Sequence, residues 1–184
     1  MKKILLLLLL AHISVLNAQV VALKNQVEGN GITLSSVEGM PGDVVEIELS
    51  VKNLEAFVAF QTEIPLGNNL SYVDKSAVLY RSSDHNLIAS VVNGTLKIYA
   101  YSLSNSEFLG NDGKIATFQL KLGKDPGIFN LTNTKAKMVN VNGEELTLST
   151  VDGIVCIVTP KAEISTPNIN YGHIPIRSSY TRSQ

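Results

Sequence analysis

The chain has 184 residues, of which 45% are hydrophobic and 17% charged, and its formal net charge is −1. This length suits one domain of common size with a remnant, and the absence of a run of lysines or arginines in the sequence argues against nucleic acid and anionic membranes as partners. A single cysteine, Cys156, excludes an intrachain disulfide framework, and its place in the apolar run GIVCIV predicts a buried free thiol.

The N-terminus has the pattern of a secretory signal peptide. Two lysines precede the apolar run Ile4 to Leu10, and a less apolar stretch ends at Ala18, which predicts a leader over residues 1–18 with cleavage after Ala18. The apolar run is too short for a spanning helix. We therefore expect a secreted, extracellular or cell-surface protein whose net charge is about −3, with thirteen basic and sixteen acidic residues.

After the leader, the dominant pattern is an alternation of apolar and polar residues, as in VVEIELSV, TLKIYAYS and IATFQLKL. Turn dipeptides such as Asn93-Gly94 and Asp112-Gly113 separate these runs. Strands are expected at 32–38, 44–52, 57–64, 70–73, 87–92, 95–102, 115–122, 128–132, 136–140 and 151–158. Segment 74–86 suits an irregular strand or a short helical turn, and 103–112 suits a polar loop. The sequence predicts an all-β fold, an antiparallel β-sandwich of about nine strands over residues 19–159.

The composition changes at the end of the expected sandwich. Residues 160–184 contain Pro160, Pro167 and Pro175, and the domain already has its full set of strands. We expect this tail to be either a linker or the truncated start of a second domain.

Several stretches together resemble a cohesin-type domain. They are GDVVEIELSVKN with AFQTEIPLGNNLSYV, then SDHNLIASVVNGTLKIYAYSLSNSEFLGNDGKIATFQLKL, and the closing NGEELTLSTVDGIVCIV. The resemblance covers roughly residues 30–158 and implies a jelly-roll sandwich related in architecture to carbohydrate-binding modules of the cellulose-binding type. It is nearer to divergent cohesins of bacterial surface proteins than to those of cellulose-degrading assemblies.

One departure from the assembly type is PLG at 65–67, where that type has a Tyr-Asp-Pro bend. The departure bears on dockerin binding more than on the fold. The tail, through INYGHIPIRSSYTRS, resembles the opening of an immunoglobulin-like repeat of the abnormal-spindle kind.

Strand parity defines a candidate partner-binding surface. If Leu96, Ile98 and Ala100 fill the core, the intervening residues of that strand face outward. The same rule turns Phe60, Thr62 and Ile64 inward, and the resemblance implies that these two strands are neighbours on the sheet that docks a partner. The predicted partner-binding residues are Gln61, Glu63, Lys97, Tyr99 and Tyr101. A mixed aromatic and polar patch suits a protein interface, although two tyrosines on a strand also agree with plain β-propensity.

The sequence offers little for catalysis or metal binding. A Ser-His-Asp arrangement would have to use His85 or His173, and Asp84 and His85 are adjacent, so we expect them to point apart as a solvated turn pair. Turn oxygens at 111–112 and 140–144 could hold calcium only weakly, because calcium needs six to eight oxygen ligands. No catalytic residue, metal site or cofactor is predicted.

Three functions remain open. The first is an exported, non-catalytic module that recognises a dockerin-like or cell-surface protein. The resemblance implies such a partner, and machinery for polysaccharide catabolism as one setting for it. The second is a carbohydrate-binding module on the same scaffold, because a fold does not fix a function. The third is a structural spacer of a larger surface protein. A linear row of aromatic rings would favour sugar, and a clustered patch would favour protein.

Overall fold

A computed structural model describes residues 29–159, and these residues form strands and loops. The strands are β1 (Asn30–Leu34), β2 (Val37–Gly39), β3 (Val44–Lys52), β4 (Ala59–Pro65), β5 (Leu70–Tyr72), β6 (Val78–Leu79), β7 (Asn86–Val92), β8 (Thr95–Tyr101), β9 (Lys114–Leu122), β10 (Gly127–Leu131), β11 (Thr134–Val139), β12 (Glu145–Leu146), β13 (Leu148–Val151) and β14 (Gly153–Ile157). The all-β fold is confirmed. The predicted leader and the tail lie outside the described residues. Within residues 29–159, no helix is long and apolar enough for a membrane span.

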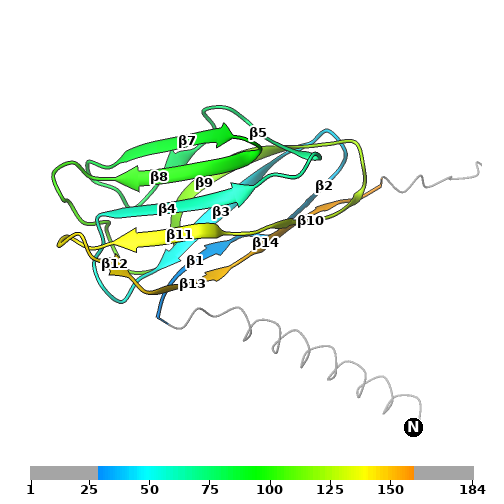
Figure 1. Ribbon diagram of the computed structural model, residues 1–184. Helices are drawn as coiled ribbons and strands as arrows, with labels where there is room; N and C mark the ends of the chain where they lie inside the picture. Colours follow the sequence, from blue (N-terminus) through cyan, green and yellow to red (C-terminus); the bar gives the residue numbers. More distant parts are fainter. Residues whose placement is uncertain (1–28, 160–184) are drawn as a thin grey trace, which may run out of the picture.

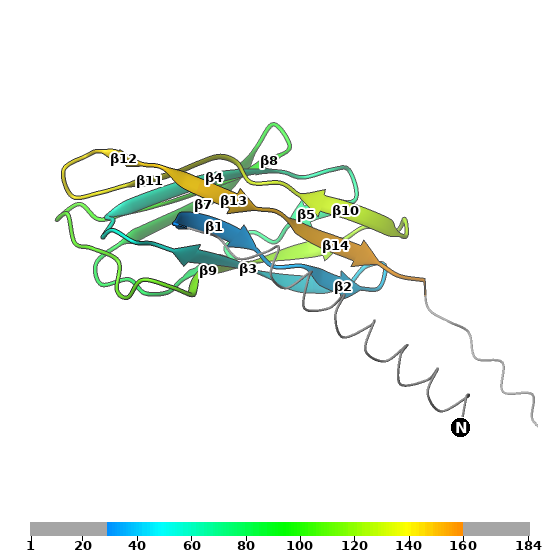
Figure 2. The same ribbon diagram turned by 90° about the horizontal axis from the view of Figure 1, so that it is seen from below.

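Two sheets pack face to face as a sandwich (Figures 1 and 2). One sheet has five strands in the order β12-β11-β4-β8-β7. The other has the order β13-β1-β3-β9-β5, with β6 also paired to β9 beyond the end of β5. The hairpin between β7 and β8 turns at Asn93 and Gly94, whose φ angles are +50° and +74°. Positive φ at both positions is what a tight hairpin with the native strand twist requires.

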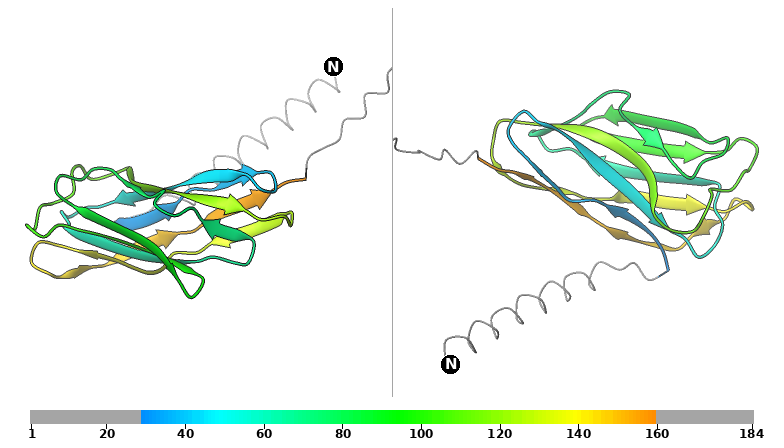
Figure 3. Two further views of the ribbon diagram at one scale, coloured as in Figure 1. Left: turned by 90° about the horizontal axis from the view of Figure 1, so that it is seen from above. Right: turned by 180° about the vertical axis from the view of Figure 1, so that it is seen from behind.

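A third, small sheet closes one end of the sandwich, with the order β10-β14-β2 (Figure 3). It exists because two long strands are broken. The expected strand 32–38 is interrupted at Ser35 and Ser36, and the expected strand 151–158 begins at Leu148 and is interrupted at Asp152. The halves β1 and β13 pair in parallel in the large sheet, and β2 and β14 pair in parallel in the small one. The strand number is consequently higher than the expected nine, and two of the pairings are parallel.

Contacts at the crossing of these strands fix both breaks. The Ser35 hydroxyl accepts a hydrogen bond from the Glu48 amide at 2.9 Å, and the Ser36 hydroxyl accepts one from the Ile154 amide at 3.0 Å. Gly153 lies against this crossing, and a Cβ atom there would stand 2.3 Å from the Ser35 carbonyl oxygen. The two serines therefore replace ladder bonds where the chain changes sheets, and only glycine leaves room for the crossing.

The segment before β7 contains the short strand β6 and no helical turn, so the irregular-strand alternative is correct. Arg81 follows β6 with a φ of +52°. Its guanidinium donates to the carbonyl oxygens of Val51, Leu109 and Gly110 and to the Asn53 side chain, at 2.6 to 2.9 Å. Arg81 thus ties the polar loop between β8 and β9 to the end of β3.

Cys156 does not lie in the core, contrary to expectation. Its neighbours Val155 and Ile157 are buried, and the alternation of β14 turns the free thiol to the outer side, where it is partly exposed. The apolar run GIVCIV gave no sign of this, because it is apolar at both parities.

Candidate partner-binding face

The outer side of the five-stranded sheet carries the candidate surface. The strand register sets Gln61 opposite Tyr99, and Glu63 opposite Lys97, across β4 and β8. Residues directly opposite in an antiparallel pair share one face, so the structure brings all five predicted residues together on two adjacent strands. The inward residues of both strands are buried as strand parity predicts: Phe60, Thr62, Ile64, Leu96, Ile98 and Ala100.

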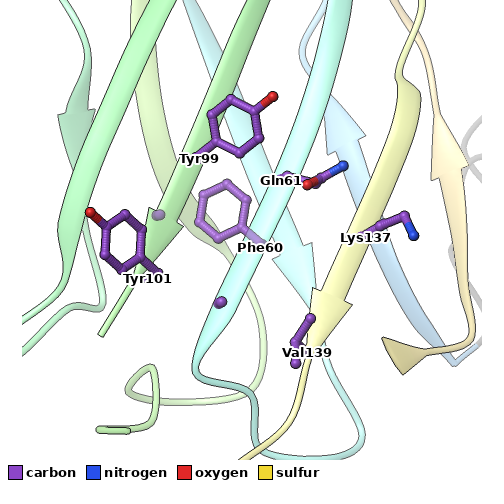
Figure 4. A pocket seen from close by; sticks show the side chains of 8 residues that line it. Phe60, Gln61, Tyr99, Tyr101, Lys137 and Val139 are labelled. Carbon is purple, nitrogen blue, oxygen red and sulfur yellow. The ribbon is translucent and has the colours of Figure 1, made fainter. Parts of the chain in front are cut away.

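A hollow of about 140 Å³ lies on this face over the three middle strands β11, β4 and β8, toward the end of the sheet where β4 begins (Figure 4). Ala59 stands opposite Tyr101 on one side and Val139 on the other. Because its side chain is a single methyl group, the larger neighbours project past it and form walls. The hollow is lined by Ala59, Phe60, Gln61, Tyr99, Ala100, Tyr101, Lys137 and Val139. It is a partly apolar depression with polar groups at its rim.

Glu63 forms ion pairs with two lysines of this face. Its side chain is nearly covered, and its two carboxylate oxygens pair with Lys97 Nζ at 3.1 Å and Lys135 Nζ at 3.2 Å. The hydrogen bond from Lys97, followed by that from Lys135, lowers the pKa of Glu63 against the opposing effect of burial, and the same pairing raises the pKa of Lys97. Glu63 therefore orients two lysines on the face and offers little carboxylate surface of its own.

Four further side chains of this face were not predicted from the sequence, and one of them is Lys135, the partner of Glu63. Lys137 and Val139 come from β11, and Ile88 comes from β7, where it stands opposite Tyr99 and is 46% exposed. The sequence gave no signal for β11 as the neighbour of β4, because the two strands are more than seventy residues apart. The register shifts between Thr134 and Lys137, where Lys135 has a φ of +50°, and Lys135 and Lys137 are both exposed.

Asp84 and His85 do not form a catalytic arrangement. The expectation that His85 is solvated is wrong, because its side chain is fully covered. The centroid of its ring lies 3.6 Å from that of Phe108, and burial lowers the pKa of His85. Asp84 accepts hydrogen bonds from the hydroxyls of Ser104 and Ser102, in that order the main causes of its lowered pKa. In a triad the histidine lies between the serine and the carboxylate, whereas here the serines bind the carboxylate directly.

Of the turn oxygens considered for calcium, those at 140–144 are engaged within the turn between β11 and β12. Asn140 Oδ1 accepts from the amides of Asn142 and Glu144, each at 3.0 Å, and Asn140 Nδ2 donates to the Glu144 carboxylate at 2.9 Å. The described residues hold no group of three or more His, Cys, Asp or Glu side chains suited to a metal ion.

The family model of the cohesin domain matches residues 31–157, most of the chain and nearly all of the described sandwich. The chain belongs to the cohesin family. The resemblance noted in the sequence is thereby confirmed over the same span. No curated protein sequence matches the chain.

Solved structures of cohesins share this fold. A non-cellulosomal cohesin from Archaeoglobus fulgidus is 16% identical, with 72% of this chain and 93% of that chain covered and a TM-score of 0.62. The cohesin in a type I cohesin–dockerin complex from Clostridium thermocellum is 20% identical, with 71% and 100% covered and a TM-score of 0.60. A type II cohesin from the cellulosome of Acetivibrio cellulolyticus is 13% identical, with 70% and 95% covered and a TM-score of 0.57. These identities show a shared fold.

Membership in the family defines the coarse function. A cohesin domain is a protein-binding module without catalytic activity, in agreement with the expectation that this chain is not an enzyme.

Proposed function

We propose that this cohesin domain binds a protein partner through the outer side of its five-stranded sheet. The observation that carries the proposal is the hollow at Ala59, walled by Tyr99 and Tyr101 and bordered by Lys137. Protein interfaces favour an apolar, aromatic centre with a polar rim, and a concave site at the centre suits one anchoring side chain of a partner. Three of the five predicted residues, Gln61, Tyr99 and Tyr101, line the hollow, and Glu63 and Lys97 lie further along the same two strands.

The partner is a dockerin-like module or a cell-surface protein, encountered after export through the leader at residues 1–18. Support for this partner class comes from the family, since relatives of the same fold were solved in complexes with dockerins. The setting would be a surface assembly, including one that handles polysaccharides. The departure at 65–67, next to the end of β4, leaves cell-surface partners of other kinds within the proposal.

Two observations favour protein over carbohydrate at this face. Tyr99 and Tyr101 are two residues apart on one strand and flank a hollow, so they form a cluster and not a long row of rings (Figure 4). The chain contains no tryptophan, whose ring is a usual platform for sugars.

The test is a binding assay with residues 19–159 against purified dockerin modules, secreted and surface proteins, and a panel of polysaccharides. For a captured protein, Tyr99→Ala should weaken binding by about 2 kcal/mol, or about 30-fold in Kd, because a central tyrosine is a typical hot spot. The melting temperature should hardly change, since Tyr99 lies outside the core. Val44→Ala, which trims an exposed side chain on the other sheet, is the matched control.

Each other outcome contradicts the proposal in its own way. A protein that binds wild type and Tyr99→Ala equally would place the interface elsewhere. Retention on a polysaccharide alone would establish a carbohydrate-binding module. No binding in any arm would favour the spacer function.

A further inference from the structure

Strand β7 forms an open edge of the five-stranded sheet (Figure 1). One side of the strand pairs with β8 over all seven of its residues, and within residues 29–159 no strand pairs with the other side. The other edge strands of the three sheets have two to five residues each. In the described domain, β7 is therefore the longest edge.

This edge lacks the features that usually prevent pairing with another chain. Natural proteins protect sheet edges with charged side chains, proline or a bulge. The sequence of β7, NLIASVV, contains no charged residue, proline or glycine, and its register with β8 runs without a shift. Its side chains Ile88, Val91 and Val92 are exposed. A long, apolar and uncharged edge of this kind can accept an added strand.

The free edge presents the backbone groups of three residues. The Ser102 amide, at the end of β8, donates to the Val58 carbonyl oxygen next to β4. Backbone bonds alternate between the two sides of a strand, so the even-numbered residues of β8 bond toward β4 and the odd-numbered ones toward β7. The odd-numbered residues of β8 stand opposite the even-numbered ones of β7. Leu87, Ala89 and Val91 consequently turn their N–H and C=O groups to the free edge.

The spacing of these three residues makes the edge complementary to itself. In an antiparallel pair of two copies with a two-fold axis at Ala89, Ala89 meets its own equivalent, and Leu87 of each copy meets Val91 of the other. Each of these three pairs exchanges two hydrogen bonds, about six in all. Every edge-facing group is then satisfied, and the pairing brings no like charges of the two strands together.

The side chains also suit this register. On the inner side of the sheet, Leu87 of the second copy would stand beside Val91, which is one wall of a hollow of about 380 Å³. Leu66, Leu70 and Tyr72 are further walls of the same hollow. The central pair of the contact consists of two methyl groups, so the two backbones can approach without crowding. The second copy thus brings a leucine to an apolar hollow.

We propose that two copies of this domain pair through β7, antiparallel about Ala89, and join their five-stranded sheets into one continuous sheet. The contact is smaller than a standard protein interface, so the dissociation constant of the dimer lies in the micromolar range. The two-fold axis is perpendicular to the sheet, and both hollows at Ala59 therefore face the same side. The proposal does not depend on partner binding at that hollow.

The first test is sedimentation equilibrium of the chain from residue 19 to 184 over a series of concentrations. We expect wild type to pass from monomer to dimer as the concentration rises. Ala89→Pro removes an N–H that faces the free edge, which an edge strand tolerates, and it should raise the dissociation constant at least about tenfold.

Val91→Lys should weaken the dimer to a similar extent, because it places a lysine of each copy in the apolar contact. Val44→Lys makes the same change at an exposed valine of the other sheet and should leave the dissociation constant unchanged. Circular dichroism verifies that each variant is folded.

A disulfide tests the register itself. In a chain with Cys156→Ser, Ala89→Cys places two thiols at the two-fold axis, where paired Cα atoms lie about 5.5 Å apart, within disulfide reach. Mild oxidation should link two such chains. Val92→Cys should not link them, because its equivalent lies six positions away along the paired strand, about 20 Å.

Three results would overturn the proposal. One is a monomer at every concentration up to about 1 mM. Another is a dimer that neither Ala89→Pro nor Val91→Lys weakens, which would place the contact elsewhere. The third is disulfide formation at Val92→Cys that equals or exceeds that at Ala89→Cys.

Discussion

Ala59 decides the shape of the candidate face at the level of single residues. It is the smallest side chain in its row, between Tyr101 and Val139, and the hollow exists because nothing larger fills that position. A bulky side chain there would remove the hollow without entering the core, since Ala59 lies on the outer side.

Ala59→Phe should therefore abolish partner binding, with at least a tenfold loss of affinity expected when a central pocket is filled. The fold should survive, because aromatic residues suit exposed strand positions. Isothermal titration and thermal unfolding check the two halves of this prediction. Val44→Phe, on the other sheet, controls for added apolar surface. Undiminished affinity in Ala59→Phe would show that the partner does not use the hollow.

Glu63 makes a pH-dependent contribution to stability. Its folded pKa lies below the ordinary value of 4.5, chiefly because of the hydrogen bond from Lys97. A lowered carboxyl pKa stabilises the fold above the unfolded pKa, and this stabilisation is lost as the pH falls through the folded pKa.

Glu63→Gln should consequently be less stable than wild type at pH 7, where it leaves Lys97 and Lys135 without their shared carboxylate. At a pH well below 4.5 the gap should narrow, because wild-type Glu63 becomes protonated as the pH falls through its lowered pKa. Urea unfolding at both pH values measures the two differences, with the exposed Glu55→Gln as control. A difference of the same size at both values would mean that charge is not its cause.

At the scale of the strands, the crossing at Gly153 is the most constrained element. A methyl group there would stand 2.3 Å from a backbone oxygen, which cannot move as a side-chain tip can. We expect Gly153→Ala to lower the free energy of unfolding by about 1–3 kcal/mol, the usual cost of overpacking. Gly67→Ala is the matched control, because nothing lies within 4 Å of its added Cβ and its φ is not positive. Equal stability of the two variants would show that the crossing can relax.

Alternation and turn dipeptides made most strands predictable from the sequence. The runs at 44–52, 95–102 and 115–122 coincide with β3, β8 and β9 to within a residue at each end. The breaks at Ser35 and at Asp152 were not predictable, because each depends on contacts with a strand about a hundred or more residues away. The two-residue strands β6 and β12 are too short to carry a period.

At the scale of the whole molecule, the family and the outward-facing residues of β4 and β8 could be inferred from the sequence, but the shape of that outer side could not. Parity turned Tyr99 and Tyr101 outward, and this part of the prediction is confirmed. The hollow needs Lys137 and Val139, whose place beside β4 follows from long-range pairing and from a bulge at Lys135. The carboxylate of Glu63 is likewise covered by its pairing with Lys97 and Lys135, and no local sequence pattern identifies these neighbours.

The parallel pairs at the two breaks also determine how the domain meets a pulling force. The first strand, β1, begins at Asn30 beside Leu148, and the last, β14, ends at Ile157. At the usual rise of a strand, Ile157 lies about 30 Å beyond Leu148 in the direction in which β1 runs. Tension on the two ends therefore runs along the strands and across their hydrogen bonds. The bonds of both parallel ladders are loaded together in shear and cannot open one by one from an end. As a link in a tethered chain, the domain would resist extension until a whole ladder gives way.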